Sequence, residues 1–199
     1  MRWEQAHMRL WLLLTGVLAS VVNGSAGSPV VDLHGTARSG DRPEPRAVVW
    51  LDASASAAPA VSVTPRLDQR NLDFSPRILA VRVGTVVDFP NNDRVFHNVF
   101  SFHDGKRFDL GLYPGGTVKQ VMFDHPGLSR IFCNIHPNMA AYVMVVDTPH
   151  YSVSDSDGRF TIEGVAPGSY TYHAWRPGGP ELTGSAVAEA GRSLDLRWP

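Results

Sequence analysis

The chain has 199 residues, with 18 Lys or Arg and 19 Asp or Glu, so its formal net charge at pH 7 is −1. This length accommodates one large or two small domains, and the balanced charge gives no basis for nucleic-acid binding. The single cysteine, Cys133, excludes an intramolecular disulfide, a Cys-x-x-Cys redox pair and a zinc ribbon.

Residues 1–26 have the pattern of a secretory signal peptide. Two arginines precede a mostly apolar run over residues 10–22, and small residues follow as far as Ala26. A membrane span needs about 20 apolar residues, so stable membrane insertion is not expected. We predict cleavage near Ala26 and a periplasmic location, with either Met1 or Met8 as the start.

Residues 27–65 are predicted to hold the first strands of a small β-sandwich, or an N-terminal extension. Residues 31–36 and 47–51 have strand-like composition, whereas residues 53–60 are rich in Ala and Ser and indicate a loop or linker.

Residues 66–148 alternate in hydrophobicity with a period of two, as in residues 79–83 and 118–123. Gly, Pro and Asn-Asp turns separate these stretches, and almost no segment keeps a helical period. The expected fold class is therefore all-β, with strands packed as a sandwich.

Residues 149–199 have a hairpin pattern, in which Asp157-Gly158 closes one tight turn and Pro167-Gly168 opens the next strand. This segment resembles the carboxypeptidase regulatory-like or transthyretin-like β-sandwich modules. The resemblance extends to residues 31–51, which suggests a small sandwich nested around residues 66–148. Two domains in series are the alternative.

The strongest chemical signal is a Cys-x-x-His-x-x-Met spacing formed by Cys133, His136 and Met139. A thiolate, imidazoles and a weak thioether are the donors of blue-copper electron-transfer sites. His97 is the obvious further donor from elsewhere in the chain. Met144 competes with Met139 as the thioether, although its apolar surroundings favour a place in the core.

His97-Asn98-Val99, the strand before it and the Cys-His-Met loop resemble the cupredoxins, the blue-copper proteins. In loop spacing the resemblance is to the amicyanin, methylamine-utilisation type, and it covers residues 66–148. It implies a Greek-key β-sandwich with one type 1 copper ion. His97, His136 and Cys133 would be the equatorial ligands and Met139 the axial one. In that family the residue at Asn98 ties the two ligand loops together.

The resemblance implies a periplasmic one-electron carrier that is not an enzyme. We expect a monomer that docks transiently with a redox partner, such as a c-type cytochrome or a dehydrogenase. The alternatives are a copper chaperone or store, a structural module with a vestigial copper site, and a hydrolytic zinc site at the Cys and two His residues. His103 and His125 match no ligand position and are expected at the surface or rim.

Overall fold

The computed structural model describes residues 29–52, 64–102 and 104–199. The predicted signal peptide, the Ala/Ser-rich linker and His103 lie outside these residues. The described chain consists of 17 β-strands joined by turns and loops, which confirms the all-β prediction. Within the described ranges there is no helix with the length and apolar character needed to cross a membrane.

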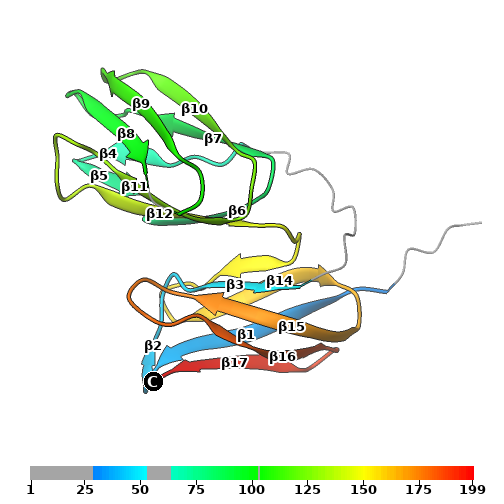
Figure 1. The fold of residues 1–199 in the computed structure, drawn as a ribbon. Helices are drawn as coiled ribbons and strands as arrows, with labels where there is room; N and C mark the ends of the chain where they lie inside the picture. Colours follow the sequence, from blue (N-terminus) through cyan, green and yellow to red (C-terminus); the bar gives the residue numbers. More distant parts are fainter. Residues whose placement is uncertain (1–28, 53–63, 103) are drawn as a thin grey trace, which may run out of the picture.

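Two β-sandwiches lie one above the other in Figure 1 and pack against each other. The strands of the outer sandwich come from both ends of the chain. One sheet has the order β14-β1-β17, with β2 paired to β1, and the other has the order β13-β3-β15-β16. The bounds are β1 Val31–Ser39, β2 Arg42–Pro43, β3 Val48–Leu51, β13 Tyr151–Val153, β14 Arg159–Val165, β15 Gly168–Trp175, β16 Leu182–Ala188 and β17 Ser193–Trp198. Both sheets thus combine early and late strands, and the other sandwich is inserted between them.

The core of the outer sandwich follows from period-2 alternation. In β17, Leu194, Leu196 and Trp198 point inward, whereas the residues between them are exposed. Gly35 in β1 leaves room for the ring of Phe160, with which a Cβ at this position would clash. In the core of the outer sandwich, large apolar side chains thus fill the space that small residues leave.

The inserted sandwich has a mixed five-stranded sheet in the order β6-β12-β11-β8-β9, in which β6 runs parallel to β12. The pairs β4-β5 and β7-β10 form the opposite layer. The bounds are β4 Asp68–Arg70, β5 Asp73–Ser75, β6 Ile78–Arg82, β7 Thr85–Pro90, β8 His97–Ser101, β9 Phe108–Tyr113, β10 Val118–Phe123, β11 Gly127–Phe132 and β12 Ala140–Val146. The core between the layers contains Cys133 and Met139.

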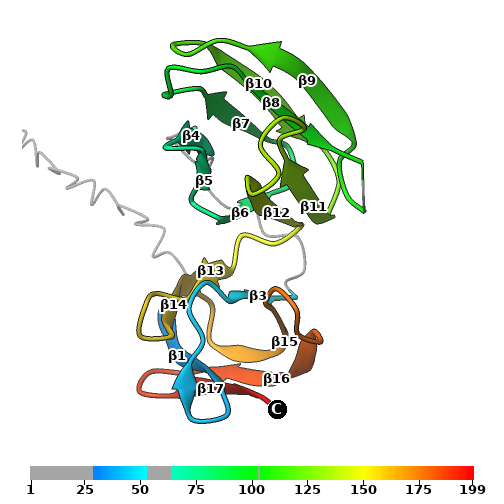
Figure 2. The ribbon, with the colours of Figure 1, turned by 90° about the vertical axis from the view of Figure 1, so that its left-hand side faces the viewer.

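An apolar cluster joins the two sandwiches. Its buried members Ile78, Met144 and Val146 come from β6 and β12, and Val48 comes from β3 of the outer sandwich. The chain crosses between β12 and β13 at the same junction (Figure 2). The sandwiches thus share a packed contact rather than only a linker. The domain limits at residues 66, 148 and 149 remain predictions.

Candidate metal centre

Neighbouring strands bring the predicted ligands together. His97 is the first residue of β8, and Cys133 directly follows β11, which pairs with β8. The loop from Cys133 to Met139 connects β11 to β12 and is closed by its own backbone. The Cys133 N–H donates to the Met139 carbonyl (3.3 Å), and the Met139 N–H donates to the His136 carbonyl (3.0 Å). The short Cys-x-x-His-x-x-Met spacing is therefore one compact loop at the sandwich end.

Three donor atoms converge at this end of the inserted sandwich. The Nδ1 atoms of His97 and His136 are 3.0 Å apart, and the Cys133 Sγ lies 4.0 Å from the first and 3.6 Å from the second. The three side chains form the potential metal-binding group found among the described residues. Both histidines thus direct the same ring nitrogen at the thiol.

The spacing fits a metal ion of ordinary bond length. A point equidistant from the three donor atoms lies about 2.1 Å from each. This distance is close to metal–nitrogen and metal–sulfur bond lengths, which at zinc are about 2.0–2.1 and 2.3 Å. These donors therefore need little movement to hold a copper-sized ion. A thiolate with two imidazoles is also the equatorial donor set of blue-copper sites.

Met139 and Met144 belong to different cores. Met139 is fully buried in the core cluster that contains Cys133. Met144 lies in the cluster between the two sandwiches, on the other face of the sheet. Only Met139 shares the surroundings of Cys133, which leaves it as the better candidate for a thioether ligand.

The accessibility of the ligands is uneven. His97 and Cys133 are buried, whereas His136 is partly exposed. A partly exposed imidazole next to a buried thiol gives the site one edge that reaches the surface.

Asp93, which the sequence reasoning missed, holds His97 in place. Its Oδ2 accepts a hydrogen bond from His97 Nε2 (2.8 Å), so the opposite ring nitrogen, Nδ1, points toward Cys133. Burial raises the pKa of Asp93, but hydrogen bonds from Leu72, His97 and Asn71 outweigh it and lower the pKa below its usual value. The signal in the sequence is an acidic residue four positions before the first ligand.

The turn between β4 and β5 supports the same carboxylate. The backbone N–H groups of Asn71 and Leu72 donate to Asp93 at 2.6 and 2.9 Å. Both turn residues have positive φ, 55° and 58°, as a two-residue type I′ hairpin turn requires. The β4-β5 hairpin therefore reaches His97 through Asp93.

Asn98 differs from the expectation drawn from the cupredoxins. Its side-chain Nδ2 donates to Asp109 of β9 (2.7 Å) rather than tying the two ligand loops together. A register shift between Asn98 and Phe100 in the β8-β9 pairing accompanies this contact.

His125 pairs with Asp124 on an exposed surface just before β11, at the opposite end of that strand from Cys133.

Solved structures that are similar to part of this chain include copper proteins. A Cu-containing nitrite reductase (NirK) from Thermus scotoductus SA-01 is 23% identical with a TM-score of 0.42 over 49% of this chain, which spans only 26% of NirK. A novel purple cupredoxin from Nitrosopumilus maritimus is 26% identical with a TM-score of 0.38, over 41% of this chain and 99% of that one. The oxidised state of a mutant amicyanin is 19% identical with a TM-score of 0.40, over 49% of this chain and 98% of that one.

These TM-scores lie below 0.5, so the interpretation of the site depends on its own donor atoms. Residues 150–195 match the family described as "Polysaccharide lyase family 4, domain II". The resemblances to transthyretin-like modules and to the methylamine-utilisation type stay predictions. No curated protein sequence matches the chain.

Proposed function

We propose that the chain is a periplasmic type 1 copper protein that carries single electrons and catalyses no bond chemistry. The observation that carries this proposal is the convergence of the His97, His136 and Cys133 donor atoms about one point, with Met139 buried in the same core. Copper held by such donors would supply one-electron chemistry by alternating between its +1 and +2 states. His97, His136 and Cys133 would hold the copper ion, with Met139 as a further, weaker ligand.

The protein side of the site is suited to changing little between redox states. Asp93 fixes the His97 ring, and backbone hydrogen bonds close the Cys133–Met139 loop. Partners of this kind orient metal ligands and tune the metal. The closed, mostly buried site is less suited to handing copper on, as a chaperone must.

Four residues that adjoin the site in the chain or through a hydrogen bond have exposed apolar side chains, and we call them the apolar collar. They are Leu72, Val95, Phe96 and Ile135, with 50, 44, 55 and 45% of their surface exposed. Val95 and Phe96 precede His97, Ile135 precedes His136, and Leu72 donates to Asp93. Such a small apolar surface suits brief docking with a c-type cytochrome or a dehydrogenase, because transient redox contacts are at the small end of interface sizes.

The first experiment is to add one equivalent of Cu(II) to the purified mature protein and to record visible and EPR spectra. We expect an intense band near about 600 nm and a narrow copper hyperfine splitting, as blue-copper coordination implies. Cys133→Ser should abolish the band. Tight binding of zinc with no blue copper form would instead favour a hydrolytic or structural zinc site at the same residues.

Two methionine variants test the axial ligand. Met139→Leu should raise the reduction potential, because the weak axial ligand tunes the potential of blue-copper sites. Met144→Leu is the matched control, since it removes a buried thioether on the other face of β12, and it should leave the potential unchanged. The reverse result would make Met144 the ligand.

Electron transfer is tested by mixing the oxidised copper protein with a reduced c-type cytochrome in a stopped-flow instrument. Loss of the cytochrome's reduced spectrum as the blue band bleaches would support the carrier role. A blue protein that exchanges no electrons with cytochromes or with itself would overturn that role while leaving the copper site intact.

A further inference from the structure

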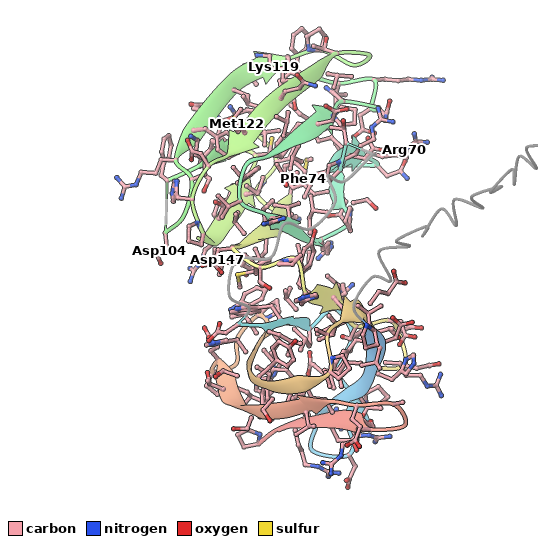
Figure 3. The ribbon with its side chains drawn as sticks, turned by 90° about the vertical axis from the view of Figure 1, so that its right-hand side faces the viewer. Arg70, Phe74, Asp104, Lys119, Met122 and Asp147 are labelled. Carbon is pink, nitrogen blue, oxygen red and sulfur yellow. The ribbon has the colours of Figure 1, made fainter. Side chains whose placement is uncertain are left out.

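A cleft of about 320 Å³ opens where the two sandwiches meet, at a position distinct from the metal donors. Met144 and the end of β12 line one wall, together with the start of β11, and β3 and β15 line the other. Asp147, labelled in Figure 3, lies at this junction. The lining residues are Trp50, Pro126, Gly127, Leu128, Met144, Val145, Val146, Asp147, Trp175 and Glu181.

The lining combines aromatic rings and carboxylates without any balancing basic side chain. Trp50 and Trp175 supply the rings, and Asp147 and Glu181 supply two carboxylates. No Lys, Arg, Ser, Thr, Asn or Gln is among these described lining residues. Arg130 lies two residues beyond Leu128 on β11 and is not part of the lining.

The two carboxylates bonded to His173 keep that group of side chains, next to the cleft, negative. His173 stacks on Trp50 with ring centroids 5.2 Å apart and bonds both Glu181 (2.9 Å) and Asp52 (3.1 Å). Even with His173 protonated, the three groups together carry one negative charge, to which Asp147 adds another. The same contacts fix the Glu181 carboxylate and one face of Trp50.

We infer that this cleft binds a small organic cation, of the alkylammonium or quaternary ammonium class. Aromatic faces attract cations through the ring quadrupole, and aromatic cages recognise quaternary ammonium groups in this way. The volume is at the lower end of the range for small-molecule pockets. A saccharide would need several hydrogen-bonding side chains, and besides two carboxylates the lining offers only the indole N–H groups of its two tryptophans.

Separate elements build this site, because each sandwich supplies one carboxylate and the outer one supplies both tryptophans. Asp147 follows β12 of the inserted sandwich, and Glu181 precedes β16 of the outer one. A bound cation would therefore contact both units. The inference does not depend on copper binding, since none of the metal donors lines the cleft.

The test is a titration of the full mature chain with choline, followed by the indole N–H signals of its tryptophans in two-dimensional NMR. Ascorbate keeps any bound copper in the diamagnetic Cu(I) state. We expect the Trp50 and Trp175 signals to shift with millimolar saturation. Trp198 is an internal reference, because it is fully buried and its indole donates to the Pro180 carbonyl (2.8 Å).

A neutral ligand of the same shape and variants that lack one carboxylate separate the contribution of charge to choline binding from that of shape. 3,3-Dimethylbutan-1-ol, the neutral isostere of choline, should bind at least about fivefold more weakly, as expected for losing one unit-charge interaction in water. Asp147→Asn and Glu181→Gln should each weaken choline binding by a similar factor. Glu189→Gln is the matched control, because Glu189 is an exposed carboxylate outside the lining and should leave the affinity unchanged.

Three outcomes would overturn the inference. They are equal binding of choline and its neutral isostere, shifts produced by a neutral disaccharide but not by choline, and unchanged choline affinity in the Asp147→Asn, Glu181→Gln double variant. Absence of any shift at about 50 mM choline, well above the expected millimolar saturation, would overturn it as well.

Discussion

The two sandwiches differ in what their interiors contain. The inserted sandwich buries polar side chains near its metal-site end, including Gln69, Asn91, His97 and Asn98, whereas the core cluster of the outer sandwich is apolar and, beside it, the described residues bury the small hydroxyl of Ser154. Burying a polar group is unfavourable unless it is hydrogen-bonded. The inserted sandwich therefore gives up apolar packing where its donors lie, and the outer sandwich does not.

Buried polar side chains of the inserted sandwich hold the backbone around the site in place. Asn91 donates to the carbonyls of Val95 and Tyr113 at 2.9 and 3.1 Å, which fixes the chain just before His97. Tyr113 donates to the Phe89 carbonyl (3.1 Å), and burial raises the pKa of its hydroxyl. The polar interior of the inserted sandwich therefore positions the metal ligands, whereas the core of the outer sandwich contributes apolar packing.

The largest expected effect tests whether the outer core only supplies packing. Trp198→Ala removes the largest fully buried side chain, and we expect a loss of about 3–5 kcal/mol in the free energy of unfolding. The copper spectrum of the folded variant should be unchanged, because all proposed ligands lie in the inserted sandwich. Denaturant titration followed by circular dichroism measures the first effect, and visible spectroscopy measures the second.

Phe89→Ala is the counterpart in the inserted core, where Phe89 is also fully buried. It should cost a similar free energy and also perturb the copper spectrum. A perturbed spectrum in folded Trp198→Ala would show that the outer core shapes the metal site and would remove the contrast between the two regions.

The next effect concerns Asp93. Asp93→Asn replaces an anion that accepts three hydrogen bonds with an amide, one end of which must face an N–H donor. Loss of a partner that orients a ligand typically lowers metal affinity about 10–100-fold. Competition with a chelator of known affinity measures this loss. Asp88→Asn is the control, because Asp88 contacts Arg66 and Gln120 but no metal donor, and it should leave the affinity unchanged.

The sequence predicts the metal donors well but not the groups that orient them. Cys133, His136 and Met139 lie within seven residues, so their spacing alone indicates one loop, and His97 is the obvious further donor, which the resemblance to cupredoxins supports. The position of the Asp93 carboxylate depends on a hydrogen bond from a turn 21 residues earlier in the chain. The cleft is harder still, since Trp50, Met144 and Trp175 meet only after both sandwiches have packed. Side chains joined by tertiary packing leave no local pattern.

A smaller effect separates stability from docking at Leu72. This residue has a φ of 58°, and the left-handed conformation costs a non-glycine residue about 1–2 kcal/mol. Leu72→Gly removes that strain but makes the unfolded chain more flexible, so we expect stability to rise by at most about 1 kcal/mol. It also removes part of the apolar collar, so electron self-exchange between two copies, measured by NMR line broadening, should slow.

Asn71→Gly is the matched control at the neighbouring turn position. Asn tolerates positive φ better than Leu does, so this change should affect stability less and leave the collar intact. Equal self-exchange rates in Leu72→Gly and the parent protein would mean that Leu72 takes no part in docking.

The smallest effect belongs to His173 of the outer sandwich. Burial lowers the pKa of His173, but Glu181 and Asp52 outweigh it and raise the pKa above its usual value. The protonated ring therefore stabilises the folded state fully below the unfolded pKa of about 6.5, and this contribution is lost as the pH rises through the higher folded pKa. Its carboxylate partners are about half exposed, so the contribution should stay below about 1 kcal/mol.

His150 acts in the opposite direction and must be separated from His173. Burial lowers its pKa, so its contribution to stability is lost as the pH falls below the unfolded value. The difference in unfolding free energy between the parent protein and His173→Gln, measured from pH 5 to 9, cancels the His150 effect. That difference should be largest at low pH and shrink as the pH rises. A difference that does not change with pH would mean that His173 is held by stacking on Trp50 rather than by its charge.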